Sequence, residues 1–267
     1  MDVKDKVIVV TGGASGIGAA LARCFTKEGA KFVALADMDE AGANAVAKDI
    51  GASAKAYKLD VTDEAAVEAF ARQVEADAGP IDLYFSNAGI IFSDAPDWTV
   101  ISQSNEQWQK IWEVNVFAHV LACRAVLPGM LKREGCGFIV TASAAGLLSQ
   151  IGDTSYSTTK HAAVGFTESL AISHGDDGLY VACLCPQAVV SKMTAGAENS
   201  SAAGDGVMPA EEFAARVLSG MREGRFMIRP HDQVEGYFLN KAKDYDRWVG
   251  GMRKFRRHQL ATTGRPI

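Results

Sequence analysis

A glycine-rich turn near the N-terminus constrains the fold of this chain more than any other stretch. The β-branched residues 6–11 lead directly into Gly12-Gly13-Ala14-Ser15-Gly16-Ile17-Gly18, and an alanine-rich helical stretch follows. A strand, a glycine turn and a helix in this order let the backbone approach a pyrophosphate, whose charge the amides and dipole of the helix start stabilise. The glycine spacing departs from the general Gly-x-Gly-x-x-Gly pattern, but its place between strand and helix favours a dinucleotide site over a turn without a ligand. We expect the contacts from this turn to come from Gly12, Ser15, Gly16, Ile17 and Gly18.

A second β-rich run, residues 31–37, ends in Asp37, which lies 19 residues beyond Gly18. An acid at about this distance is expected to bind the adenosine ribose hydroxyls of NAD and to repel the additional phosphate of NADP. No basic residue follows at Met38, and Ser15 stands where a basic residue of the turn would suit NADP. NAD is therefore the favoured cofactor. Asp37 could instead cap the helix predicted at residues 39–50, a task for which Asp39 is equally suited.

The alternation of strands and helices continues along the chain and predicts an α/β fold. Further strands are expected at residues 54–59, 81–86, 138–142, 179–185 and 225–229, and helices at residues 63–78, 105–133 and 209–223 and from about Ser155. A chain of 267 residues can bury a full core, and α/β folds of this size often form one domain, so we expect a single domain.

Composition excludes several classes of function. A net charge of −5 argues against a nucleic-acid binder. No apolar run approaches the roughly 20 residues needed to span a bilayer, and residues 1–5 are too acidic and short to open a signal peptide, so a cytoplasmic protein without a membrane partner is expected. The five cysteines include no Cys-x-x-Cys pair. Cys183 and Cys185 are therefore interpreted as small buried side chains, and we predict no disulfide framework and no metal site.

The residues with the clearest chemistry are Ser143, Tyr156 and Lys160. Ser143 ends a predicted strand, and the four-residue spacing of Tyr156 and Lys160 places them on one face of a helix. A phenol has an ordinary pKa of about 10, and an adjacent ammonium lowers that pKa toward the range useful for acid/base catalysis at a carbinol or carbonyl. Ser143 would bind the same substrate oxygen. On its own the Tyr-x-x-x-Lys spacing is weak, because a packed tyrosine beside a solvated lysine is the commoner arrangement.

Taken together, the motifs of this chain resemble those of the short-chain dehydrogenases/reductases. The matching segments are residues 11–18, Asp60-Val61, Asn87-Ala88-Gly89, Asn115, Ser143 and residues 156–160, and the resemblance extends from the start of the chain to about residue 195. It implies a Rossmann-like, doubly wound sheet of about seven mostly parallel strands and a bound NAD(P). It also implies that Asp60 and Val61 flank the adenine, and that Asn87, Ala88 and Gly89 support the sheet and the cofactor.

The same resemblance assigns roles to the catalytic residues. Tyr156 is the expected acid/base, Ser143 polarises the substrate oxygen, Lys160 lowers the pKa of Tyr156 and holds the nicotinamide ribose, and Asn115 anchors a water-mediated proton path. Asn115 lies within an apolar helical stripe, so it is either a satisfied structural residue or part of such a relay. Further cofactor contacts are expected from Pro186, Val189 and Ser191. Gln187 stands where the family usually has glycine; its side chain either enters the substrate side of the site or points outward.

Two later segments are expected to form a substrate lid and a C-terminal helical extension. Residues from about 190 to 208 are rich in small residues and predict a lid. A C-terminal extension, about 231–260, carries Tyr245, Trp248, Met252 and Phe255 at helical spacing, and predicts a helix packed on the body or on a neighbouring subunit. Its basic cluster, residues 253–258, is interpreted as a solvated helix end rather than a membrane or nucleic-acid patch.

The sequence therefore predicts an NAD-dependent dehydrogenase that oxidises a secondary alcohol to a ketone. The candidate substrate contacts are Ile91, Phe92, Ala145, Leu147, Gln150, Gln187 and Met193, and their largely apolar character favours a hydrophobic, aromatic or alicyclic alcohol. Two alternatives stay open: an NADP-dependent ketone reductase, which Asp37 disfavours, and a non-catalytic NAD sensor or scaffold, which the intact Ser143, Tyr156 and Lys160 disfavour. The resemblance also implies a homotetramer or homodimer built on the helices around Asn115 and Tyr156.

Overall fold

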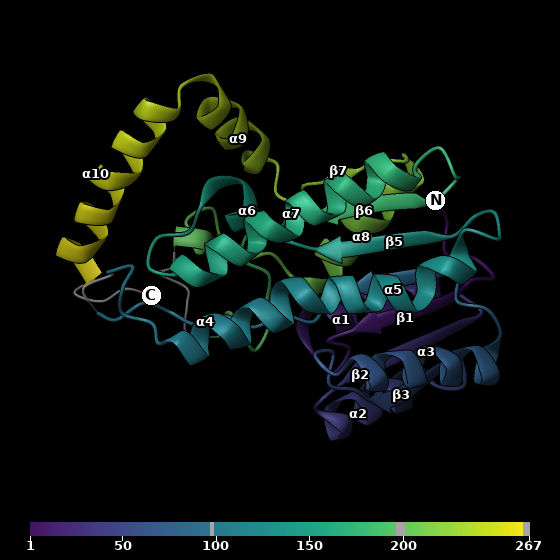
Figure 1. Ribbon diagram of the computed structural model, residues 1–267. Helices are drawn as coiled ribbons and strands as arrows, with labels where there is room; N and C mark the ends of the chain where they lie inside the picture. The colour runs from purple at the N-terminus through teal and green to yellow at the C-terminus, as the bar shows by residue number, and fades with distance from the viewer. Residues whose placement is uncertain (97–98, 196–200, 264–267) are drawn as a thin grey trace.

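The structure is a computed structural model that describes residues 1–96, 99–195 and 201–263. Its centre is a seven-stranded sheet in which every pairing is parallel, with strand order β3-β2-β1-β4-β5-β6-β7 (Figure 1). The strands are β1 Val7–Thr11, β2 Phe32–Asp37, β3 Ala54–Lys58, β4 Leu83–Ser86, β5 Gly137–Thr141, β6 Tyr180–Leu184 and β7 Met227–Ile228. This sheet confirms the predicted Rossmann-like fold. β7 is shorter than predicted at residues 225–229.

The strand order reverses direction between β1 and β4. β1 is followed in sequence by β2 on one side, and the chain later returns to place β4 on the other side of β1. In open parallel sheets such a switch point leaves a crevice at the carboxyl ends of the strands, where ligands bind. All five residues of β1 are buried, as expected for a strand covered on both faces.

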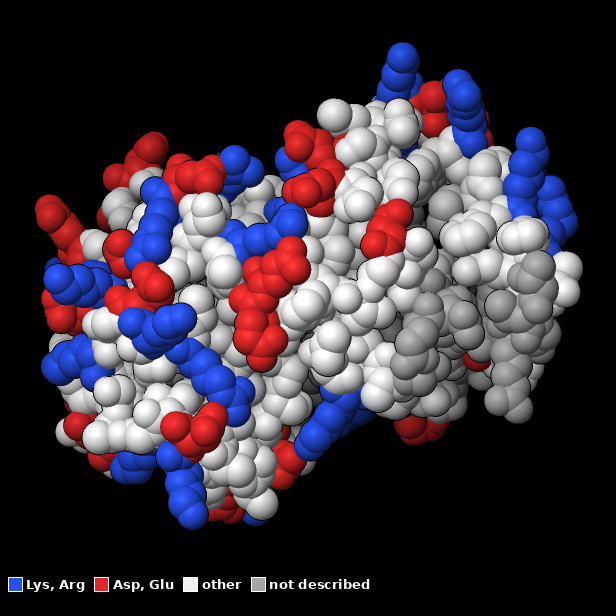
Figure 2. All heavy atoms as spheres, turned by 180° about the vertical axis from the view of Figure 1, so that it is seen from behind, with Lys and Arg blue, Asp and Glu red and all other residues white. Residues whose placement is uncertain are grey.

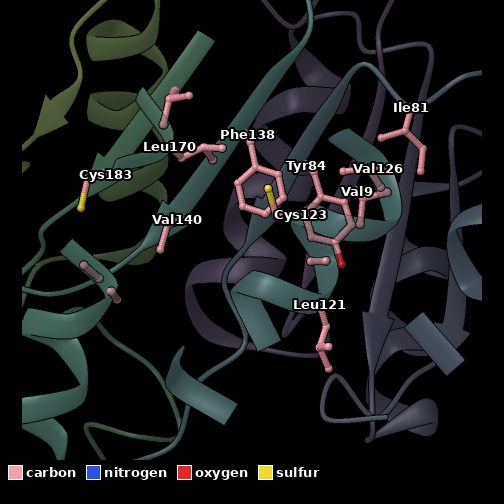
Figure 3. Packing of buried hydrophobic residues seen from close by; sticks show 14 of the residues in the cluster. Val9, Ile81, Tyr84, Leu121, Cys123, Val126, Phe138, Val140, Leu170 and Cys183 are labelled. Atoms are coloured by element: carbon pink, nitrogen blue, oxygen red, sulfur yellow. The ribbon is translucent and has the colours of Figure 1, made fainter. Parts of the chain in front are cut away.

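Helices cover both faces of the sheet and divide the core into two layers. One face is covered by α3 (Glu64–Ala78), α5 (Ala118–Met130) and α7 (Thr154–His174), and the other by α1 (Gly16–Lys27), α2 (Glu40–Ile50) and α8 (Ala210–Arg222). Figure 3 shows the first layer, where Tyr84 of β4 and Phe138 of β5 stack with ring centroids 5.4 Å apart. Phe138 is fully buried and Tyr84 is 1% exposed, so the stacked rings form part of the core beneath the two strands whose ends carry the site.

The predicted helix at residues 105–133 is divided into three parts. α4 (Asn105–Trp112) leads into a π-helical turn, Glu113–Phe117, and then into α5. By length and composition alone, Asn105–Met130 could cross a membrane, yet half of its most apolar window is buried inside the protein. The π turn holds Asn115 fully buried, in keeping with the frequent occurrence of such turns at functional sites.

The chain after β5 differs from expectation in two places. A short helix, α6 (Ala145–Leu148), lies between Ser143 and α7, where the sequence predicts no helix. The C-terminal extension forms two helices rather than one, α9 (Gln233–Lys243) and α10 (Tyr245–Thr263), which meet at Asp244. Buried Lys241 donates to the carbonyl of Leu147 at 2.6 Å and so ties α9 to α6. α9 and α10 project from the end of the body next to α6 and α7 (Figure 1).

The basic residues of α10 lie in solvent. Arg253, Lys254 and Arg257 are exposed, and Figure 2 shows Lys and Arg side chains gathered over the end of the molecule that α10 forms, whereas the body carries both signs of charge intermixed. Cys183 and Cys185, as predicted, are buried and free, with their sulfurs 3.8 Å apart.

Candidate active site

A cavity of about 350 Å³ runs along the carboxyl ends of the strands at the switch point between β1 and β4. It brings together most of the predicted site residues from segments far apart in sequence. Its lining includes Gly12, Ser15, Gly16, Ile17, Gly18, Asp37, Asn87, Ala88, Gly89, Ser143, Tyr156, Lys160, Pro186, Val189 and Ser191. Asp60 and Val61 follow the end of β3 and are not among the lining residues. The Asp60 carboxylate accepts from the backbone and hydroxyl of Thr62, and Val61 packs on the core.

The glycine turn can be formed only without side chains at two of its positions. Gly12 has φ +70°, and a Cβ there would lie 3.0 Å from the side-chain nitrogen of Asn87. A Cβ on Gly18 would lie 2.1 Å from the carbonyl oxygen of Gly12, a clash with backbone that no rotamer relieves. Glycine at both positions therefore lets the turn close on itself and pack against the segment that follows β4.

The start of α1 suits an anion. Ser15 is the N-cap residue but makes no side-chain capping hydrogen bond, and the first turn of the helix carries no acidic residue. The amide groups of that turn are therefore left for another partner, and the helix dipole favours a negative charge there. A dinucleotide pyrophosphate fits this donor set.

At the adenosine end of the cavity, Asp37 and Asp39 have different tasks. Asp39 caps α2 by accepting from the backbone N–H of Gly42 at 2.9 Å. The capping residue of α2 is therefore Asp39 and not Asp37. The Asp37 carboxylate accepts from the backbone amides of Ala14 at 3.0 Å and Asp39 at 2.9 Å. It is thereby held at the cavity with acceptor capacity remaining for ribose hydroxyls.

Cations are scarce along this cavity. Among the described lining residues only Lys160 and Lys192 are basic. Lys192 pairs with Asp39 at 3.1 Å, and Lys160 is buried at the opposite, catalytic end. The adenosine end thus combines an aspartate with a lysine already paired to another aspartate.

Thr11 and Asn87 hold the two strand ends together at the switch point. The Thr11 hydroxyl accepts from the backbone amides of Asn87 and Ala88 at 2.9 and 3.0 Å, and the Asn87 side chain donates to the carbonyl of Thr11 at 2.9 Å. These bonds explain why a threonine precedes the glycine turn and an asparagine follows β4. They fix the floor of the cavity at the point where the two strands diverge.

Tyr156 and Lys160 lie one turn apart on α7 and are both buried, with exposures of 8% and 3%. The Lys160 ammonium donates to the carbonyl of Thr141 at 2.9 Å and lies 5.6 Å from the centroid of the Tyr156 ring. Burial lowers the pKa of Lys160 to about 8. Burial also raises the pKa of Tyr156 to about 12, and a hydrogen bond with Ser143 acts in the opposite direction.

The expectation that Lys160 lowers the pKa of Tyr156 is therefore corrected for the free protein. Loss of water around the phenol outweighs any stabilisation of the phenolate, and the nearby Asp153 raises the pKa further. Tyr156 is consequently protonated at neutral pH in this state.

Ser143 faces the tyrosine from the opposite wall. It follows the end of β5, and its hydroxyl donates to the carbonyl of Pro186 at 3.3 Å and accepts from the backbone of Ala145 at 3.1 Å. The bond to Pro186 joins the end of β5 to the segment after β6. A substrate oxygen lying against Tyr156 would meet the Ser143 hydroxyl as well.

Asn115 is a fully satisfied buried side chain. Its oxygen accepts from the amide of Ile90 at 2.8 Å, and its nitrogen donates to the carbonyl of Ile90 at 2.9 Å and to the Thr159 hydroxyl at 3.2 Å. It therefore joins the π turn to the segment after β4 and to α7, next to Lys160. Of the two interpretations left open for this side chain, the structure shows the satisfied structural one; a role in a proton path stays a prediction.

Two buried polar residues next to predicted site residues escaped the sequence analysis. Asp153 lines the cavity three residues before Tyr156. Burial raises the pKa of its carboxyl group to about 6. The hydrogen bonds that it accepts from Ser93 at 2.7 Å and Gln150 at 2.5 Å act in the opposite direction. Nδ1 of buried His231 accepts from the backbone N–H of Gln187 at 3.2 Å, and its Nε2 lies 3.2 Å from the carbonyl oxygen of Ala188. Neither residue belongs to a local motif, so only tertiary contacts reveal them.

A second cavity of about 430 Å³ adjoins the first. The C-terminal extension contributes much of its apolar wall through Tyr237, Trp248, Met252 and Phe255. The two cavities share Ser143, Gln150, Gln187 and Ala202. The helical spacing of the tail was recognised in the sequence, but its place beside Ser143 was not, because nothing local indicates where α10 packs.

The predicted substrate residues divide between these spaces. Ile91, Gln150, Gln187 and Met193 line the first cavity, and Ala145, Gln150 and Gln187 line the second. Phe92 and Leu147 line neither cavity: Leu147 is buried in the core, and Phe92 packs on a cluster that contains Ile111 and Tyr156, so their contact with a substrate stays a prediction. In the predicted lid, Val189 and Met208 form a parallel bridge, and residues 196–200 lie outside the described residues.

Known proteins are similar to this chain in sequence. The family model for short chain dehydrogenase matches residues 6–202. The chain is 36% identical over 197 residues to a meso-2,3-butanediol dehydrogenase from Serratia marcescens, covering 73% of this chain and 76% of that protein. It is 34% identical over 249 residues to a galactitol 2-dehydrogenase from Agrobacterium fabrum, covering 92% and 94%.

A solved structure has the same fold. The crystal structure of a short chain dehydrogenase/reductase from Burkholderia phymatum in complex with NAD is similar with a TM-score of 0.83 at 25% identity. The match covers 92% of this chain and 96% of that chain.

Proposed function

The chain belongs to the short-chain dehydrogenase/reductase family, and on that premise we propose that it oxidises a hydrophobic secondary alcohol to the ketone with NAD. Family membership makes it an oxidoreductase that interconverts alcohols and ketones with a nicotinamide dinucleotide. The observation that carries the finer proposal is a single cavity with Asp37 and the start of α1 at one end and Ser143, Tyr156 and Lys160 at the other.

NAD fits the residues that line this cavity. The first-turn amides of α1 would hold the pyrophosphate, Asp37 the adenosine ribose, and Lys160 the nicotinamide ribose. Bound there, NAD supplies the nicotinamide ring, which is the acceptor for the hydride of the carbinol carbon. The carboxylate of Asp37 disfavours the additional phosphate of NADP, and a solved relative holds NAD.

The side chains at the other end of the cavity bind the oxygen of the substrate and transfer its proton. Ser143 and Tyr156 both offer a hydroxyl to the oxygen of the substrate, which fixes its orientation. Tyr156 takes the hydroxyl proton of the alcohol in oxidation and returns it in ketone reduction. Lys160, with a pKa of about 8, is largely charged at neutral pH and stabilises the phenolate that oxidation requires.

The apolar second cavity supports a hydrophobic substrate. Trp248, Met252 and Phe255 of α10 and Leu148 of α6 present hydrocarbon next to Ser143. Burial of an aromatic or alicyclic ring against such side chains is favourable in proportion to the apolar area removed from water. Two relatives are named for the dehydrogenation of polyhydric alcohols, butanediol and galactitol.

We also propose that the chain acts as a homodimer or homotetramer. Its support is the exposure of Trp112 and Phe117 on the α4 and π-helical segment and of Ile172 on α7. Sedimentation velocity should give a mass of two or four chains, and a monomer at micromolar concentration would contradict the proposal.

Replacing Tyr156 by phenylalanine should lower kcat for alcohol oxidation by about 10² to 10⁴-fold, because the proton acceptor is lost while the ring still packs. NADH formation at its absorbance band measures this, and NAD affinity measured by calorimetry should stay close to that of the wild type. Tyr180→Phe is the matched control, since the Tyr180 hydroxyl donates to the carbonyl of Arg225 away from the cavity. Full turnover by the Tyr156 variant would exclude the assignment.

Replacing Asp37 by asparagine should relax the choice of cofactor. The ratio of the NADP to the NAD dissociation constant should fall at least about tenfold, because one charge-assisted acceptor is lost and the repulsion of a phosphate disappears. Calorimetric titration with each dinucleotide measures the ratio. Asp63→Asn, at the N-cap of α3, is the control; an unchanged ratio in the Asp37 variant would show that this carboxylate does not select the cofactor.

A further inference from the structure

A buried histidine contacts the chain segment that follows β6. Residues 186–189 of this segment line the catalytic cavity. The carbonyl of Pro186 accepts from the hydroxyl of Ser143 at 3.3 Å and from the backbone N–H of Ala144 at 2.7 Å, which joins the segment to the catalytic serine. His231 is 5% exposed and is not among the described residues that line either cavity. It therefore meets this wall of the cavity from behind.

The order of the sheet brings His231 to this place. β7 pairs with β6 in parallel, with Ile228 beside Leu184, so the segments that follow the two strands leave the sheet at the same edge. His231 is the third residue after Ile228, and its carbonyl accepts from the backbone N–H of Val234 at 3.1 Å, in the first turn of α9. The imidazole thus extends from a backbone that is itself held in place.

The two ring nitrogens of His231 face two successive residues of the segment. Nδ1 lies 3.2 Å from the backbone nitrogen of Gln187, and Nε2 lies 3.2 Å from the carbonyl oxygen of Ala188. A ring nitrogen that faces an N–H group has to accept, and one that faces a carbonyl has to carry the proton, so these partners require the neutral Nε2–H tautomer. Burial lowers the pKa of His231 below its ordinary value, which keeps the ring neutral at neutral pH.

The hydrogen bond to Gln187 has no substitute within the described part of the chain. The carbonyl of Ala188 also accepts from the backbone N–H of Met208 at 3.0 Å, and the N–H of Ala188 donates to the carbonyl of Ala202 at 3.3 Å. The N–H of Gln187, by contrast, donates to His231 alone among these residues. A donor that loses its acceptor inside a protein is unfavourable, so removal of the imidazole should let the chain shift at Gln187.

This part of the wall lies at the nicotinamide end of the proposed cofactor site. Hydride transfer requires the nicotinamide to lie next to a carbinol whose oxygen contacts Ser143 and Tyr156. The bonds from Ser143 and Ala144 to Pro186 place the segment beside that position. Asp37, which would hold the adenosine ribose, lies at the other end of the cavity.

We propose that His231 is a positioning residue for the nicotinamide. It holds the peptide of Gln187 and Ala188 so that the wall of the cavity fits the ring, and it does so without touching the cofactor. The inference rests on the proposed function, and it assigns a part in cofactor binding to a side chain outside the cavity.

A comparison of NAD with ADP-ribose tests this proposal, because ADP-ribose is the same molecule without the nicotinamide. Calorimetric titration at neutral pH gives the dissociation constant of each ligand. In His231→Leu the ratio of the NAD to the ADP-ribose dissociation constant should rise at least about fivefold over the wild type. A general loosening of the fold would instead weaken both ligands alike and leave the ratio unchanged.

Two further variants make the result specific. His231→Asn can place its amide oxygen where Nδ1 lies and accept from Gln187, so its ratio should stay within about twofold of the wild type. His174→Leu is the matched control, because His174 pairs with Asp177 at 2.9 Å on α7 and lines neither cavity. Its ratio should equal that of the wild type.

Thermal unfolding establishes that each variant is folded. If His231→Leu does not fold, nitrogen-15 spectra of the wild type decide, with His231→Asn identifying the ring signals by their loss. The neutral Nε2–H tautomer at neutral pH is the expected result. A protonated ring or the Nδ1–H tautomer would overturn the proposal, since neither can accept from Gln187.

The failures can be told apart. If the wild type binds neither NAD nor ADP-ribose, the proposed function itself is wrong. If it binds both, the cofactor assignment stands, and the role of His231 is refuted by an unchanged ratio in His231→Leu. An equally raised ratio in His231→Asn would also refute it, because the bond to Gln187 would then not be the cause.

Discussion

The site depends on a buried ammonium. Lys160 has almost no contact with solvent and donates to the carbonyl of Thr141 at 2.9 Å. Burying a charged lysine is unfavourable, which is why its pKa falls to about 8, and the carbonyl at the end of β5 offsets part of that cost. The bond also fixes α7 against β5, and with them the distance between Tyr156 on the helix and Ser143 just beyond the strand. The bond thus positions the acid/base group, whereas burial sets the pKa of Tyr156 in the free protein.

The parallel sheet provides the setting for this bond. All seven strands end at the same edge, and Thr11 and Asn87 join β1 to β4 where the connections diverge. One cavity therefore extends from the start of α1 to Lys160, long enough to present a dinucleotide to Tyr156. The C-terminal helices then close a second cavity against Ser143, and Asp205 joins Gln187 to Tyr237 of α9 at the boundary. The two cavities are thus formed by different parts of the chain that meet at Ser143 and Gln187.

Local signals determined how much the sequence could predict. The glycine turn, Asp37 and the spacing of Tyr156 and Lys160 are each legible within a few residues, and the structure places all of them at one cavity. The pKa of Tyr156 could not be predicted, because burial by distant segments outweighs the adjacent charge. The same holds for Leu147, which α6 turns into the core, and for Asp153, His231 and Trp248, whose places depend on tertiary packing. The π turn at Asn115 has no compositional signature either.

The central claim is that burial keeps the proton on Tyr156 in the free protein and that the acid/base pair acts from this dry environment. Spectrophotometric titration of phenolate absorbance, taken as the difference between the wild type and Tyr156→Phe without cofactor, tests it most directly. The account predicts no Tyr156 phenolate up to the ordinary phenol pKa of about 10, with ionisation near 12. A phenolate signal from Tyr156 already present near neutral pH in the free protein would contradict it.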